Sequence, residues 1–158
     1  MTVYFLDSNA IVKYYINEPG YVWVRRTVND KSNTSVVCEI SLAEVAAGLA
    51  QARRSQRFGG TLMSNTYRRF RTDLRQLLFI GHPATIDVAD LAAQLAMRRP
   101  LKGCDALQVA SALMTESTLM PKVRIIFVSG DDQALRAAQA EGLLTGNPFD
   151  HIDEDKIR

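Results

Sequence analysis

Four acidic residues stand where apolar runs of the chain give way to helix-like patterns. They are Asp7, Glu44, Asp105 and Asp131. Carboxylates gathered within a few ångströms repel one another unless a cation lies among them. Oxygen ligands suit Mg²⁺ or Mn²⁺, and the chain has no His and Cys set at the spacing of a zinc site. If these acids meet, they can bind such an ion beside a phosphodiester and favour attack by water, as metal-dependent nucleases do.

Each acid also has a purely structural explanation, because short polar side chains and acids are common in the first turn of a helix. Asp7 can cap a helix, and Ser41 with Glu44 matches a capping box. Either Asp131 or Asp132 can cap the last helix. Taken one at a time, these structural roles are favoured. The repetition of the pattern is what favours a common functional site.

The acids need a framework that brings them together, and the chain alternates between strand-like and helix-like segments. Strands are expected over 2–6, 35–38 and 123–128. Helices are expected after Asp7 and over 45–52, 61–78, 88–96, 105–115 and 133–141. This alternation predicts one α/β domain over 1–158, with a mainly parallel central sheet flanked by helices. In such a sheet the strand-to-helix turns share the carboxyl edge, where ligands bind, so the acids are expected to converge there.

The composition is that of an ordinary globular domain. The chain has 158 residues, 47% of them hydrophobic, which is enough for one sizeable core. No apolar run is long enough to span a membrane, and the first residues lack a secretion signal, so a cytoplasmic protein without membrane contact is expected. The two cysteines, Cys38 and Cys104, are expected to be small buried thiols.

Positive charge is concentrated in the segment 53–75, although the net charge of the chain is only +2. This segment has seven arginines and a single acid, Asp73. The arginines could bind the phosphates of single-stranded RNA, or they could form a solvated helix face. For the interleaved Tyr67 and Phe70, a place in the core or in a dimer contact is favoured over base stacking.

Four segments of the chain together resemble a known family. They are Leu6–Lys13 (LDSNAIVK), Ser41–Glu44 (SLAE), Asp105–Ala110 (DALQVA) and Phe127–Asp131 (FVSGD). In this order they look like the motifs of PIN domains, and the branch they most resemble is that of VapC-type toxins. The resemblance extends from Thr2 to about Phe149.

The resemblance implies a magnesium-dependent endoribonuclease that hydrolyses single-stranded or structured RNA, with Mn²⁺ as a possible substitute. Asp7, Glu44 and Asp105 would bind the metal directly or through water, and Asp131 would complete the site from further out. Accessory polar roles are implied for Ser8, Asn9 and Ser129. Toxins of this branch also imply a homodimer and a small cognate antitoxin that inserts a basic side chain, expected to be arginine, into the acidic pocket.

Two details and one alternative bear on this interpretation. Gln108 stands where relatives often have histidine, and Asp131 is preferred over Asp132 because it lies two residues after Ser129. A phosphatase that forms an aspartyl phosphate would need a second acid at the position of Asn9, so that class is set aside. The alternative is a non-catalytic PIN-like module that binds RNA or a protein partner.

Overall fold

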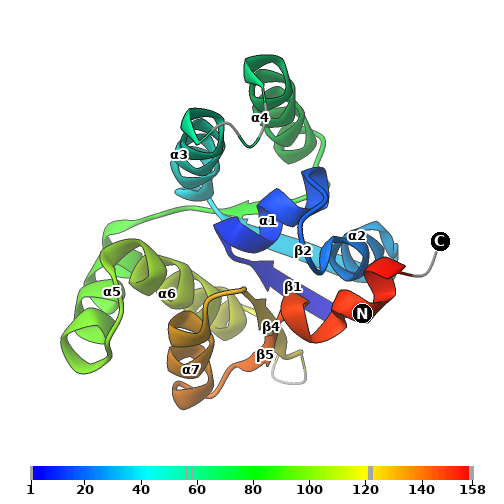
Figure 1. Ribbon diagram of the computed structural model, residues 1–158. Helices are drawn as coiled ribbons and strands as arrows, with labels where there is room; N and C mark the ends of the chain where they lie inside the picture. The colour runs from blue at the N-terminus through cyan, green and yellow to red at the C-terminus, as the bar shows by residue number, and fades with distance from the viewer. Residues whose placement is uncertain (1, 56, 58, 121–122, 157–158) are drawn as a thin grey trace.

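A computed structural model, which describes residues 2–55, 57, 59–120 and 123–156, shows a central sheet of five strands (Figure 1). The strand order is β3-β2-β1-β4-β5, and every neighbouring pair is parallel. The strands are β1 (Thr2–Leu6), β2 (Asn33–Cys38), β3 (Ile80–His82), β4 (Ile125–Val128) and β5 (Leu144–Gly146). The predicted fold, a single α/β domain with a parallel central sheet, is therefore confirmed.

Helices cover both faces of the sheet (Figure 1). On one face lie α1 (Ser8–Tyr15), α2 (Tyr21–Asn29), α3 (Ser41–Arg54) and α4 (Gly60–Arg75). On the other lie α5 (Ile86–Arg98), α6 (Gly103–Thr118) and α7 (Asp132–Ala140). The chain then forms a 3₁₀ segment, η1 (Pro148–Lys156), which packs against α2. None of the helices in these described ranges is long and apolar enough to cross a membrane.

Two hydrophobic clusters, one on each face, hold these layers together. In β1, Phe5 packs into the cluster shared with α5, α6 and α7, whereas the next residue, Leu6, packs into the cluster shared with α1 to α4. Phe127 and Val128 divide between the two faces in the same way at the end of β4. This period of two is the pattern of a strand buried on both faces. It fixes the direction in which the chain leaves each strand.

Several elements differ from the sequence-based expectations. The strands β3 and β5 and the segments α2 and η1 were not expected, and Gly81–Pro83 was interpreted as a turn although Gly81 and His82 belong to β3. Both unexpected strands have three residues and lie at the edges of the sheet, so they lack the buried apolar run that marks β1 and β4. Of the two cysteines, Cys38 is buried as expected, but Cys104 is exposed because it lies in the first turn of α6.

Helix α4 ends three residues earlier than the expected helix over 61–78. Its end is a Schellman motif, in which the Leu78 amide donates to the carbonyl of Asp73 and the Leu77 amide to that of Leu74. Leu77 occupies the left-handed position of this motif with φ of 60°. Glycine is the usual residue there, and the sequence signal for the helix end was therefore missing. Phe70, in contrast, is fully buried, as expected for a core residue.

Candidate active site

A cavity of about 620 Å³ opens at the carboxyl edge of the sheet, beside the end of β1. Asp7, Glu44, Asp105 and Asp131 all line it. Three of them follow the strands β1, β2 and β4, and Asp105 is in the first turn of α6, the helix that leads into β4. Helices that connect parallel strands begin at the carboxyl edge, so the topology alone brings the four acids to one side of the sheet.

Asp7 is the most buried of the four acids, with 3% of its surface exposed. It is the N-cap of α1, and its Oδ1 accepts a hydrogen bond from the Ser8 amide at 2.6 Å. Its Oδ2 accepts from Asn9 Nδ2 and from Ser129 Oγ, each at 2.7 Å. The Asn9 carboxamide also accepts from the Gly130 amide. The carboxylate is thus fixed by donors that come from the ends of both β1 and β4.

Glu44 is positioned by a buried polar network rather than by a capping box. The N-cap of α3 is Ile40, which has no side-chain cap, so Ser41 already lies inside the helix. The Oε2 atom of Glu44 accepts from Ser8 Oγ and from Gln108 Nε2, both at 2.5 Å. Gln108 is fully buried, and its Nε2 also lies 3.0 Å from Ser41 Oγ. The structural explanation offered by the sequence therefore does not account for Glu44.

The last two acids differ in how far helix capping explains them. Asp105 is the third residue of α6, because the helix begins at Gly103 rather than at Asp105 as expected. Asp131 does cap α7, since its Oδ1 accepts from the amides of Gln133 and Ala134. Its neighbour Asp132 is exposed, lies in a different pocket and pairs with Arg136. Asp131 is therefore the member of this pair that lies in the cavity.

The electrostatics of the cavity favour a cation. The pKa of Asp7 is raised from 3.8 to about 7, mainly by burial, with the charges of Glu44 and Asp105 contributing and the hydrogen bonds from Ser129 and Ser8 opposing the shift. The pKa of Asp105 is also raised, first by burial and then by the charge of Asp131, with Lys102 opposing. Both carboxylates are thus disfavoured as anions in the protein alone. A bound cation would favour their charged forms.

The donor set fits a hydrated, oxygen-preferring ion. Within the described ranges, no three His, Cys, Asp or Glu side chains stand close enough together to enclose a metal ion by themselves. Mg²⁺ usually keeps several of its waters and is bound by one or two carboxylates directly, so four carboxylates around one cavity suit it better than a closed site would. Asp7, with both oxygens held by hydrogen bonds, would be the best-oriented carboxylate for such an ion.

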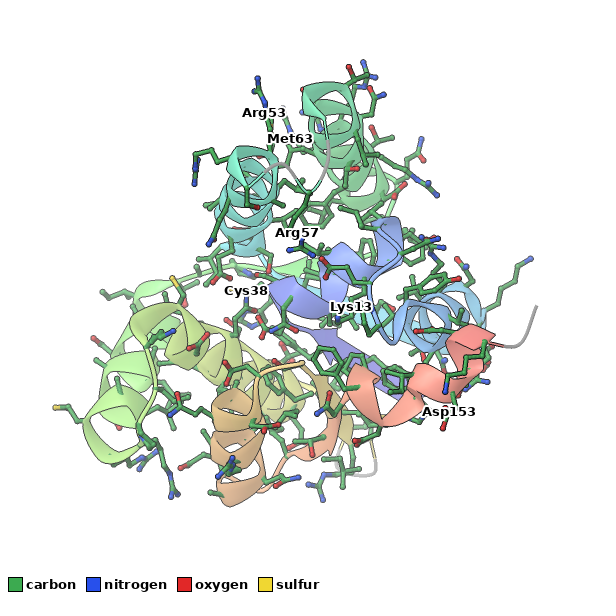
Figure 2. All side chains as sticks on the ribbon, viewed as in Figure 1. Lys13, Cys38, Arg53, Arg57, Met63 and Asp153 are labelled. Carbon is green, nitrogen blue, oxygen red and sulfur yellow. The ribbon has the colours of Figure 1, made fainter. Side chains whose placement is uncertain are left out.

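The cavity has a second, basic end that the sequence did not indicate. Lys13 on α1 is buried, with its side chain 4% exposed, and its Nζ lies 3.8 Å from Glu18 Oε2. Arg57 pairs with the other Glu18 oxygen at 2.5 Å. Figure 2 labels the side chains of Lys13 and Arg57. Phe149 of η1 lies over the Lys13 ammonium, 4.3 Å from Nζ to the ring centroid. These residues are far apart in the sequence. Lys13 is the only one of them that lies in one of the four family-like segments, at the end of Leu6–Lys13.

Part of the arginine-rich segment lines a separate groove between α3 and α4. Arg68, Arg71 and Arg75 share this groove with the apolar Leu49 and with Tyr67. Its volume is about 440 Å³. These three arginines therefore do not line the acidic cavity, and among the described residues Arg57 is the only arginine of the segment 53–75 that does.

A family model identifies the class of protein to which this fold belongs. The model of the PIN domain matches residues 4–140, so the chain belongs to the PIN-domain family. This confirms the resemblance drawn from the four motifs. Among curated protein sequences, none matches this chain at a significant level.

Solved structures of similar fold include a toxin–antitoxin complex from Klebsiella pneumoniae, which is 16% identical, with 92% of this chain and 97% of that chain covered and a TM-score of 0.60. FitAcB from Neisseria gonorrhoeae is 19% identical, with 92% of this chain and 98% of that chain covered and a TM-score of 0.58. VapBC2 from Rickettsia felis, bound to a DNA fragment from its promoter, is 13% identical with 92% and 98% covered and a TM-score of 0.61. PAE2754 from Pyrobaculum aerophilum is 12% identical with 99% and 91% covered and a TM-score of 0.67. At these identities the similarity establishes a shared fold and nothing more.

Proposed function

We propose that this protein is a magnesium-dependent endoribonuclease that hydrolyses phosphodiester bonds of single-stranded or structured RNA. The observation that supports this most directly is that Asp7, Glu44, Asp105 and Asp131 line one cavity at the carboxyl edge of a PIN fold. Asp7, Glu44 and Asp105 are proposed to hold Mg²⁺, directly or through water, with Mn²⁺ as a substitute. Asp131 is proposed to support the site from further out, because one of its oxygens already caps α7.

When bound, Mg²⁺ supplies Lewis-acid polarisation of the phosphodiester and lowers the pKa of an attacking water. The protein's own contribution is to keep the ligands in place. Ser129 and Asn9 hold Asp7, while Gln108 and Ser8 hold Glu44. Such outer contacts fix the orientation of metal-binding groups and tune their basicity. Because Gln108 donates its amide hydrogens here, it fills the orienting role at a position where relatives often have histidine.

The similarity to toxin–antitoxin structures extends the proposal to biological role. We propose that the chain is the toxin of such a pair, that it acts in the cytoplasm, and that it forms a homodimer. Its partner would be a small protein that inserts an arginine among the carboxylates, since a guanidinium can pair with them in place of the metal. Co-expression with the adjacent small reading frame should then yield a complex and relieve toxicity. If co-expression yields no complex and does not relieve toxicity, this part of the proposal is contradicted.

One observation favours a second candidate, a non-catalytic PIN-like module that binds RNA or protein. Within the described residues, no three ligand side chains are already close enough to enclose an ion. The two candidates differ in whether RNA is cut, so a cleavage assay separates them.

The test is to incubate the purified protein with RNA in the presence of Mg²⁺, with EDTA, and with the variants Asp7→Asn and Asp105→Asn. Asn has nearly the shape of Asp without its charge, so both variants should fold and lose most activity, and Asp131→Asn should lose less. Attack by water, with the 3′ oxygen as leaving group, leaves a 5′ phosphate and a 3′ hydroxyl. Cleavage that survives EDTA, or products with cyclic phosphates, would exclude the proposed mechanism. Intact RNA under every condition would favour the binding module.

A further inference from the structure

We infer that Lys13 and Arg57 form a phosphate subsite next to the acidic site, in which Glu18 holds both cations and a neighbouring phosphate of the RNA strand is bound. This inference rests on the proposed function, because it takes single-stranded RNA as the ligand. It assigns a role to three residues that lie outside the four family motifs or, for Lys13, at the end of one. It also explains why an acidic cavity can accept a polyanion.

The first observation is that Lys13 is buried with few partners. Its side chain is 4% exposed, yet it lines the same cavity as the four acids. Among the described residues no acceptor forms a hydrogen bond with Nζ, and the nearest carboxylate oxygen, from Glu18, is 3.8 Å away. A lysine ammonium has three donors, and the Glu18 oxygen at 3.8 Å is too distant to accept a hydrogen bond from any of them. The Lys13 ammonium can therefore donate to a further acceptor inside the cavity.

The second observation is the charge balance at this end of the cavity. Glu18 is the single carboxylate that pairs with both Lys13 and Arg57, one at each of its oxygens. Within these two ion pairs, two cations and one carboxylate leave one net positive charge, which the more distant Asp155 offsets in part. Burial lowers the pKa of the Lys13 ammonium, and Glu18 restores it only in part, with Asp155 contributing and Arg57 opposing. An added anion would complete the balance, and a phosphodiester supplies one charge and two free acceptor oxygens.

The third observation is the placement of this charge relative to the acids. Lys13 lies one helical turn beyond Asn9 on α1, a step of about 6 Å along the axis. Asn9 itself donates to Asp7, so Lys13 and the acidic site share one side of the helix. One turn is comparable with the step between successive phosphates of an extended strand. A strand with its scissile phosphate at the acids would therefore bring an adjacent phosphate to Lys13.

Phe149 keeps this arrangement in place. Its ring covers the Lys13 ammonium, and it also packs on Gly130, where an added Cβ would lie 2.8 Å from the Phe149 ring. A side chain at position 130 would therefore displace the Phe149 ring from this position. The Asp155 carboxylate anchors η1 by accepting from the amides of Gly20 and Val22. The first turn of η1 therefore forms one wall of the subsite.

The test measures binding of labelled single-stranded RNA of random sequence at several KCl concentrations, in an Asp105→Asn background that the proposed mechanism leaves inactive. Lys13→Met should weaken binding and reduce the slope of log affinity against log salt by about 0.7, the contribution of one phosphate contact on a single strand. Glu18→Gln should act in the opposite direction, with tighter binding and a steeper slope, because it removes the negative charge that the two cations share. Lys31→Met, at an exposed lysine after α2, is the matched control and should leave the slope unchanged.

Each outcome is informative because the two variants have opposite expected signs. If Lys13→Met lowers the melting temperature but keeps affinity and salt slope, Lys13 has a structural role and the subsite is excluded. If Glu18→Gln also weakens binding, the charge argument is wrong. If the parent protein binds RNA and Lys13→Met binds it with the same affinity and salt slope, the subsite is rejected but the proposed function is not. A parent protein that binds no RNA at all would reject the proposed function as well.

Discussion

The buried carboxylate of Asp7 should make the metal-free protein less stable as the pH rises. Its pKa is raised from 3.8 to about 7, mainly by burial, so between these pH values the folded state keeps a proton that the unfolded state has lost. The folded state then binds more protons than the unfolded state, and the free energy of unfolding falls as pH increases through this window. A shift of this size corresponds to about 4 kcal/mol, fully expressed above pH 7.

Asp7→Asn removes this titration and so provides the test. Asn at this position cannot accept hydrogen bonds at both terminal atoms, so either the Ser8 amide, which donates to Oδ1, or the Asn9 and Ser129 side chains, which donate to Oδ2, lose their acceptor. That cost, about 1–3 kcal/mol, is nearly independent of pH. The stability of the variant relative to the wild type should therefore increase by about 3 kcal/mol between pH 4.5 and pH 8, whatever its starting value.

The assay is urea unfolding followed by circular dichroism in EDTA at a series of pH values. Asp132→Asn is the control, because that side chain is 71% exposed and lies outside the cavity. Its profile should run parallel to that of the wild type. If the profiles of Asp7→Asn and the wild type also run parallel to within about 1 kcal/mol, the Asp7 carboxyl titrates normally in the fold and the argument from burial is refuted.

Three further predictions follow from other parts of the structure. Mn²⁺ at a hundredfold excess over its dissociation constant should stabilise the wild type by about 2.7 kcal/mol, and calorimetry that shows an equal shift for Asp7→Asn/Asp105→Asn would rule out the acidic metal site. Gln108→Leu fits the buried volume but leaves Glu44 with fewer donors, so isothermal titration should show metal affinity reduced about 10- to 100-fold with the fold retained. Leu77→Asn should stabilise the protein by about 1 kcal/mol, because Asn tolerates the left-handed φ of 60° better than Leu, whereas Leu77→Ala should give no gain in the urea midpoint.

The sequence predicted the elements whose signal is local. The strands β1 and β4 are short apolar runs that end at Asp7 and at Ser129, and their burial on both faces leaves a pattern in the sequence itself. The class of fold followed from the alternation of such runs with helical patterns. The place of Asp7, Glu44, Asp105 and Asp131 at one edge followed from the topology of parallel sheets. Whether these acids bind a metal stays a prediction.

Features that depend on contacts between distant segments could not be predicted in this way. The edge strands β3 and β5 are recognised only by their hydrogen bonds to β2 and β4, since Ile80 and Leu144 are about half exposed. Asp131 and Asp132 are equivalent as helix caps in the sequence, and the direction in which the chain leaves β4 places only one of them in the cavity.

The basic end of the cavity is the clearest case of a site decided by tertiary structure. In the sequence, Lys13 is one charged residue of a short helix, and charged residues of short helices are usually solvated. It is buried because Phe149, more than a hundred residues later, folds back over it, and because Glu18 and Arg57 close the other side. Local patterns are set by neighbours along the chain, whereas burial and charge pairing are set by neighbours in space.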